Sequence, residues 1–127
     1  DKMAVKQPEL VSSITMEGLE KLFAKDYPRL SVIDVHLDWC GPCEVVKPNF
    51  RTMYYEYEEP ETRLEFFTID SSLITNQSIL EKIGPVTCKP KFVIMAEGEI
   101  KGVVEGANYS EIFDYVDKHI PSFDNDD

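Results

Sequence analysis

The sequence predicts a single α/β domain in which a mixed β-sheet is flanked by helices on both faces. Short apolar runs of strand type alternate with segments of helical periodicity along most of the chain. Two adjacent strand-like runs near the end are joined by a short link that contains glycine, which indicates an antiparallel hairpin. The 127 residues, of which 43% are hydrophobic, suffice for one buried core and leave no room for a second catalytic module.

The first half of the chain is predicted to supply a helix, a strand and a second helix. Residues 15–23 place apolar side chains at helical spacing after Thr15, a residue type that caps helices. Residues 30–37 form a short β-branched run typical of a strand buried on both faces, so we expect the central strand there. Residues 41–58 repeat apolar side chains on one helical face, and Pro48 should kink this helix.

The second half is predicted to complete the sheet and to end in a helix. Residues 64–69 have the pattern of a second buried strand, and residues 73–83 that of a helix closed by glycine and proline. Residues 92–96 and 100–105 form the predicted hairpin. Residues 108–120 begin with a sequence that resembles a capping box and continue as an amphipathic helix.

The charge of the chain excludes several classes of partner. Lys and Arg number 13 against 24 Asp and Glu, and the net charge of -11 repels nucleic acid and anionic membrane surfaces. No apolar run is long enough for a signal peptide or a membrane span, so we expect a soluble, cytoplasmic protein whose partners are other proteins. We expect residues 1–120 to form the domain and residues 121–127 a short acidic tail.

Three cysteines, Cys40, Cys43 and Cys88, point to redox chemistry or to a metal. A structural zinc site needs four ligands, and only His36 and His119 could join the cysteines, without a second pair of cysteines at the same spacing. Redox chemistry is therefore favoured over a zinc half-site or two unreactive thiols. We expect no metal and no cofactor.

The predicted chemistry follows from where the cysteine pair lies. Cys40 is placed where the central strand ends and the next helix begins, and the free amides of a helix start stabilise a thiolate. Cys40 should therefore be the attacking sulfur. Cys43, one helical turn further on, should resolve the mixed disulfide, while Pro42 restricts the loop between them.

The run Trp39-Cys40-Gly41-Pro42-Cys43 after a β-branched strand resembles the active site of the thioredoxin family. The resemblance covers most of the chain and implies the thioredoxin fold, exchange with protein disulfides, and an external disulfide reductase that regenerates the dithiol. It also implies that Asp34 is the buried acid of the central strand and that Pro90 is a cis-proline facing the active site. Residues implied to contact a substrate or partner are Trp39, Gly41, Pro42, Pro90, Gly106 and Ala107.

Three positions depart from the family pattern. His36 stands where a tryptophan is usual, Glu44 follows the second cysteine where a lysine is common, and Phe66 replaces a lysine that often neighbours the buried acid. These changes are expected to retune the redox site without destroying it.

Four residues keep more than one interpretation. Asp34 either faces solvent or, as its apolar neighbours favour, is buried with a raised pKa and exchanges a proton with Cys43. Trp39 is either an exposed platform beside Cys40 or a core residue. His36 either couples to Asp34 or is a satisfied interior side chain, which is the more common case. Cys88 is either inert or a second redox position that oxidises or forms an intermolecular disulfide at the rim of the site.

A narrower resemblance connects residues 34–36, 88–92 and 103–108 with the thioredoxin-like light chains of ciliary and flagellar outer-arm dynein. It implies binding to a dynein heavy chain and a place in the axoneme. Three functions stay open at this point: a free cytosolic thioredoxin, a redox-active light chain, and an adaptor that uses the fold without turnover.

Overall fold

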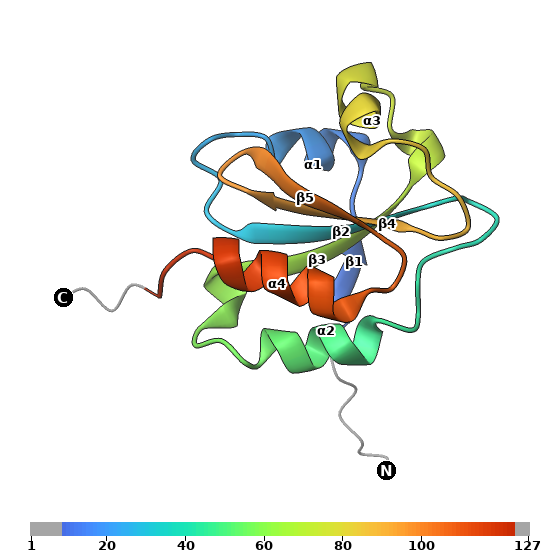
Figure 1. Ribbon diagram of the computed structural model, residues 1–127. Helices are drawn as coiled ribbons and strands as arrows, with labels where there is room; N and C mark the ends of the chain where they lie inside the picture. Colours follow the sequence, from blue (N-terminus) through green and yellow to red (C-terminus); the bar gives the residue numbers. More distant parts are fainter. Residues whose placement is uncertain (1–8, 124–127) are drawn as a thin grey trace, which may run out of the picture.

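The computed structural model describes residues 9–123 and contains a five-stranded sheet with helices on both faces (Figure 1). This arrangement confirms the predicted fold class. In chain order the elements are β1 (Val11–Ser13), α1 (Met16–Lys21), β2 (Leu30–His36), α2 (Lys47–Tyr54), the 3-10 turn η1 (Pro60–Thr62), β3 (Leu64–Asp70), the 3-10 turn η2 (Ser71–Leu73), α3 (Gln77–Ile83), β4 (Lys91–Ala96), β5 (Glu99–Glu105) and α4 (Tyr109–His119).

The sheet is mixed, with the strand order β1-β3-β2-β4-β5. β3 runs parallel to β1 and β2, whereas β4 runs antiparallel to β2 and β5. β2 lies in the middle and all of its residues are buried, as its unbroken apolar pattern predicts. The predicted hairpin is confirmed, and its turn places Glu97 at φ 57° and Gly98 at φ 74°, the left-handed pair that a tight hairpin requires.

The two faces of the sheet bury different kinds of side chain. Successive β2 residues alternate, so Val32 faces α2 and α4 while Ile33 faces α1 and α3. On the α2 and α4 face, Phe50 stacks on Phe66 with ring centroids 4.5 Å apart and meets Phe92 edge-on at 5.8 Å. The opposite face is mostly aliphatic. Each fully buried side chain of this size contributes roughly 1.5–3 kcal/mol.

Side-chain caps begin three of the helices. Thr15 accepts a hydrogen bond from the Gly18 amide at 3.0 Å, which confirms the predicted cap of α1. Asn108 accepts one from the Glu111 amide at 3.2 Å, and its own side-chain amide donates to the Glu111 carboxylate at 3.1 Å. This reciprocal pair confirms the predicted cap of α4. The Asn76 cap of α3 was not predicted.

Two predicted helices are too long. The prediction of a helix over residues 41–58 is wrong at both ends, because α2 spans only Lys47–Tyr54 and the cysteine pair lies in turns before it. Pro48 lies in the first turn of α2 and does not kink the helix, since the amide missing from proline has no acceptor there. The helix predicted over 73–83 begins only at Gln77. β1, with three residues, is too short to give a periodic signal.

The predicted boundary between the domain and the tail, after residue 120, lies next to the end of α4. α4 ends at His119, where Ile120 takes an extended conformation before Pro121. Residues 124–127 of the predicted tail 121–127, and residues 1–8, lie outside the described residues. Within 9–123, no helix combines the length and the apolar character needed to cross a membrane.

Candidate functional site

The site is built on the chain that leaves the central strand. After β2 ends, the amides of Cys40 and Gly41 both donate to the Leu37 carbonyl, at 3.2 Å and 3.0 Å. Gly41 has φ 75°, a backbone conformation that is unfavourable for residues other than glycine. These bonds form a compact turn that holds Cys40 at half exposure.

Asp34 lies under this turn. Its side chain projects from β2 toward the aromatic face, and the residue is only 2% exposed, which confirms the predicted burial. Its Oδ2 atom accepts a hydrogen bond from the Cys43 backbone amide at 2.7 Å. Its Oδ1 atom is buried and has no hydrogen-bond partner among the described residues. One carboxylate oxygen therefore fixes the cysteine turn, and the other stays unengaged.

Burial raises the pKa of the Asp34 carboxyl above its ordinary value, because the charged form loses contact with water. The hydrogen bond from Cys43 and the positive charges of His36 and Lys47 oppose this shift in part. A carboxyl that accepts a proton more readily than a surface aspartate thus lies directly behind the second cysteine.

Two of the three cysteines are joined in a disulfide. Cys40 forms a disulfide with Cys88, and their Cα atoms lie 5.7 Å apart, within the usual range. Cys43 keeps its thiol, is half-buried and packs against the aromatic core. Of the two interpretations of Cys88, the structure agrees with a position that oxidises at the rim of the site, and the partner is Cys40 of the same chain. Spacing could not reveal the pair, because the two cysteines are separated by 48 residues.

The helix-start argument for Cys40 is wrong for this structure. Cys40 precedes the first residue of α2, Lys47, by a segment of turns, and Cys43 also lies before the helix. The backbone amides around Cys40 therefore belong to a turn and not to a helix start, and the Cys43 amide donates to the Asp34 side chain. The order of the two sulfurs, with Cys40 outside and Cys43 inside, does not depend on the helix.

Pro90 and Gly106 lie together at the rim. Lys91 of β4 pairs with Glu105 of β5. Next to this pair, outside the two strands, the Gly106 amide donates to the Pro90 carbonyl at 2.8 Å. Ala107 follows and is exposed. The expected cis bond before Pro90 is wrong, because no peptide bond among the described residues is cis. Trans is the default for bonds to proline, and spacing carries no signal for an exception.

The structure settles two of the open interpretations. Trp39 is 80% exposed beside Cys40, so it is a surface side chain and not a core residue. His36 is buried, and its Nδ1 atom lies 3.0 Å from the Leu37 carbonyl oxygen, as in a satisfied interior side chain. Phe66 belongs to the aromatic stack, which explains why no lysine is found there.

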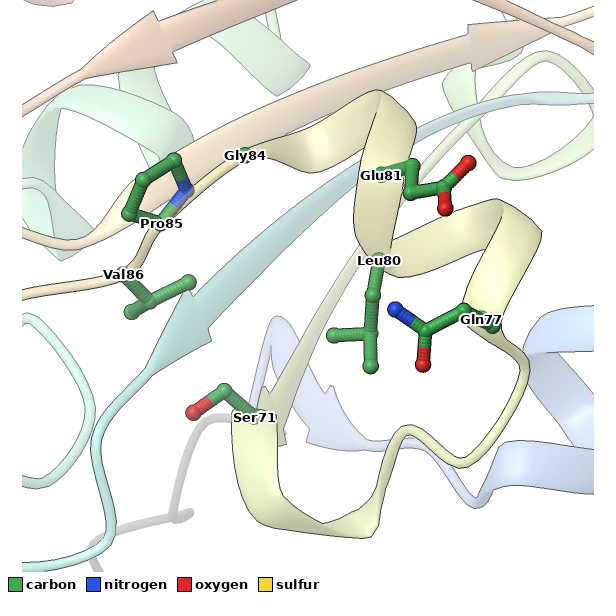
Figure 2. A pocket seen from close by; sticks show the side chains of 7 residues that line it. All are labelled: Ser71, Gln77, Leu80, Glu81, Gly84, Pro85 and Val86. Carbon is green, nitrogen blue, oxygen red and sulfur yellow. The ribbon is translucent and has the colours of Figure 1, made fainter.

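Sequence reasoning missed a shallow pocket that adjoins the segment leading to Cys88. Figure 2 shows Leu80 of α3 and Val86 flanking the space above Ser71. The only advance signal was the Gly84-Pro85 pair, which predicted a helix end and not a pocket. The full lining is Ser71, Gln77, Leu80, Glu81, Gly84, Pro85 and Val86.

Comparisons with solved structures and curated proteins agree with the fold. The fold matches the crystal structure of thioredoxin NaTrxh from Nicotiana alata with a TM-score of 0.65 and 24% identity, covering 93% of this chain and 99% of that one. Thioredoxin H3 of Arabidopsis thaliana is 33% identical over 113 residues, which are 87% of this chain and 90% of the relative.

Other relatives match over shorter shares. The flagellar outer-arm dynein 14 kDa light chain of Chlamydomonas reinhardtii is 29% identical over 83 residues, 65% of this chain and 60% of the relative. The chain spans only 13% of the length of thioredoxin domain-containing protein 3 of Rattus norvegicus, at 38% identity over 80 residues, and 45% of the rice protein thioredoxin F. The thioredoxin family model matches residues 11–118, and the chain belongs to the thioredoxin family.

Proposed function

We propose that this protein is a thiol-disulfide oxidoreductase that reduces protein disulfides through Cys40. The observation that carries the proposal is the contact between the buried carboxylate of Asp34 and the amide of Cys43, 2.7 Å apart, behind a half-exposed Cys40. This arrangement supplies an outer sulfur, an inner sulfur and a group that can hold a proton. The disulfide at Cys40 supports the choice of that sulfur as the one that exchanges.

The proposed reaction starts from the reduced chain. The Cys40 thiolate attacks one sulfur of a substrate disulfide, forms a mixed disulfide and releases the other substrate sulfur as a thiolate, which takes a proton from water. The Cys43 thiolate then attacks the Cys40 sulfur and releases the second substrate thiolate, while Asp34 accepts the Cys43 proton. Two electrons pass to the substrate, and an external dithiol reductase must return the chain to its reduced form.

The rim of the site is proposed to bind an extended segment of the substrate. Exposed Trp39 offers an apolar surface, and the backbone near Pro90 and Gly106 lies at the end of the β4–β5 ladder. Gly41, Pro42 and Ala107 complete this rim, and each is at least partly exposed. Main-chain contacts of this kind accept many sequences, which suits an enzyme with several protein substrates.

A coupled assay tests the proposal. The chain, an external reductase and a protein with an exposed disulfide should show continuous turnover. Cys40→Ser should reduce this turnover by on the order of a thousandfold or more, because a hydroxyl is a far weaker nucleophile than a thiolate at neutral pH. The exposed Ser78→Ala variant serves as the control and should match the unaltered chain. Unchanged turnover in Cys40→Ser would refute the mechanism.

A second candidate function is that of a redox-active light chain of ciliary outer-arm dynein, located in the axoneme. The match to the Chlamydomonas light chain supports it. In this proposal Trp39, Pro90 and residues 107–109 grip a segment of the dynein heavy chain. We would extract outer arms from axonemes with salt and follow the chain by sedimentation with and without a thiol reductant. Co-sedimentation is expected. A chain that remains wholly in the low-mass fraction would favour the free reductase, and binding without turnover would favour the adaptor.

A further inference from the structure

We propose that Cys88 is a second resolving cysteine, which can release a substrate from Cys40 without Cys43. The proposal rests on the proposed function, since it concerns the same exchange at Cys40. It goes further by giving the site two alternative oxidised forms, one with a Cys40–Cys43 bond and one with a Cys40–Cys88 bond.

Cys88 is placed within bonding reach of Cys40. It lies in the segment between α3 and β4, and its sulfur is bonded to the sulfur of Cys40, so the fold can bring a Cys88 thiolate to the Cys40 sulfur. The residue is exposed, which leaves its thiol open to water and to base when it is not bonded. No rearrangement of the fold is needed to bring the two sulfurs together.

The segment that contains Cys88, residues 84–90, is held at both ends. On the β4 side, the Pro90 carbonyl accepts a hydrogen bond from the Gly106 amide at 2.8 Å. On the α3 side, the Lys91 ammonium donates to the Ile83 carbonyl at 3.2 Å. Between them, the Lys89 amide donates to the Thr87 hydroxyl oxygen at 3.1 Å, which forms a turn around Cys88. The segment therefore presents Cys88 at a fixed place opposite Cys40.

Cys43 is held by a different part of the fold from Cys88. Its amide is bonded to Asp34 and its side chain packs against the aromatic core, whereas Cys88 is on the surface. The two thiols are therefore held by separate parts of the fold, one attached to the core and one at the surface. Either can take the place of the substrate sulfur in turn.

In the proposed step, Cys88 releases the substrate from Cys40. In the mixed disulfide, Cys40 is bonded to a substrate sulfur. The Cys88 thiolate, after losing its proton to water, attacks the Cys40 sulfur, forms the Cys40–Cys88 bond and breaks the bond to the substrate. The substrate sulfur leaves as a thiolate and is protonated. The chain loses two electrons and two hydrogens in the full cycle, and the substrate gains them.

The two oxidised forms can interconvert without an added reductant. The Cys43 thiolate attacks the Cys40 sulfur, forms the Cys40–Cys43 bond and releases Cys88 as a thiolate, which takes up the proton that Cys43 lost. This exchange changes no oxidation state. A dithiol reductant is required only to return either form to the three free thiols.

Three variants test the proposal: Cys43→Ser, Cys88→Ser, and the double variant Cys43→Ser/Cys88→Ser. Each reduced chain is mixed with one equivalent of a protein that has one exposed disulfide, quenched with acid at intervals, and weighed intact by mass spectrometry. The double variant should accumulate the mixed disulfide. Cys43→Ser should clear it within about tenfold of the rate of the unaltered chain, and peptide mapping should then find Cys40 bonded to Cys88.

The outcomes separate this inference from the proposed function. If Cys43→Ser retains the mixed disulfide as long as the double variant does, Cys88 does not resolve and the inference fails. If none of the chains, including the unaltered one and Cys88→Ser, forms a mixed disulfide or reduces the substrate, the proposed function fails first.

A measurement on the unaltered chain covers the case of a variant that does not fold. The reduced chain is oxidised by one equivalent of the same substrate, its free thiols are alkylated, and the peptides are mapped. A fraction with Cys43 alkylated and Cys40 linked to Cys88 supports the inference. A map that contains only the Cys40–Cys43 bond, with Cys88 alkylated throughout, would overturn it.

Discussion

The turn segment 37–46, which contains Cys40 and Cys43, and the segment 84–90, which contains Cys88, are supported in opposite ways. Segment 37–46 is attached to the interior, where the Cys43 amide binds buried Asp34. Segment 84–90 is attached at its two ends, through Pro90 and through the helix end before Gly84, and its middle is exposed.

The difference supports the proposal that Cys40 exchanges with two partners of unlike character, Cys43 and Cys88. The inner partner, Cys43, depends on core packing and on the charge of the buried Asp34 carboxyl. The rate at which Cys43 exchanges should therefore depend on the stability of the fold and on pH. The partner outside depends on backbone bonds at the surface, so it should respond to access and local geometry. Four substitutions can break or sharpen this contrast, and they follow from the largest expected effect to the smallest.

Phe50→Ala should have the largest effect, because Phe50 is buried in α2 and stacks between Phe66 and Phe92. We expect the free energy of unfolding to fall by about 3–5 kcal/mol, measured by chemical denaturation. The inner thiol of Cys43 should then become faster to alkylate. Leu73→Ala, at an exposed position, is the control and should change stability by less than about 0.5 kcal/mol. Equal losses in both variants would contradict the contrast.

Asp34→Asn should slow exchange near neutral pH by roughly tenfold to a hundredfold, because an amide cannot accept the Cys43 proton. The pH profile of single-turnover rates measures this. The fold should become more stable at neutral pH. The pKa of Asp34 is raised by burial, so ionisation weakens the folded state progressively as pH rises above the ordinary value of 3.8.

The amide has no such penalty, so the stability gain of Asp34→Asn should vanish when pH falls below 3.8, where the carboxyl is neutral in both states. Thermal melts across this range check the sign. The exposed Asp38→Asn variant is the matched control. An Asp34→Asn chain that is less stable than the unaltered one at neutral pH, or that has an unchanged rate profile, would remove Asp34 from the proposed role.

Gly106→Ala should affect the outer partner, Cys88, by slowing its bonding to Cys40. Gly106 has φ 79°, which disfavours a side chain by about 1–2 kcal/mol, although the added carbon would meet only the Lys89 side chain at 3.6 Å. The strain should loosen the bond to Pro90 and slow formation of the Cys40–Cys88 disulfide. Disulfide mapping measures the change, and Ala107→Ser next to it serves as the control. If the substitution instead slowed formation of the proposed Cys40–Cys43 bond, the two segments would not act separately.

Trp39→Ala should have the smallest effect on the fold. Its side chain is 80% exposed, so the free energy of unfolding should change by less than about 0.5 kcal/mol. The KM for a protein disulfide should nevertheless rise, on the order of tenfold, if the side chain contacts the substrate. Steady-state kinetics with two protein substrates would show it. A large loss of stability with an unchanged KM would assign Trp39 to packing.

The sequence predicted the scaffold well because its signals were local or periodic. The unbroken apolar run of β2, the glycine turn between β4 and β5 and the caps at Thr15 and Asn108 each act over a few residues. The start of α2 was predicted too early, because Val46, the first apolar side chain of the repeat, is already the N-cap of α2 and the pattern has no marker for the residues before it. Spacing reports which face a side chain takes, and it does not report whether the backbone hydrogen bonds form.

The site was predicted less completely for a different reason. The burial of Asp34 follows from its apolar neighbours in β2, so one sequence pattern was enough. The bond between Cys40 and Cys88 depends on how two distant segments meet at one edge of the sheet, and no spacing rule contains that information. The place of Cys88 two residues before Pro90 indicated that it lies at the rim of the site, but it did not identify Cys40 as the partner.

The most direct test of the central claim, that Cys40 exchanges with a protein disulfide, is a single-turnover experiment with the fully reduced chain. The chain is mixed with one equivalent of the substrate, free thiols are alkylated at intervals, and the alkylated Cys40 peptide is quantified beside the newly formed substrate thiols. The account predicts that alkylatable Cys40 disappears in step with the appearance of substrate thiols. Substrate thiols that appear while Cys40 remains fully alkylatable would contradict it.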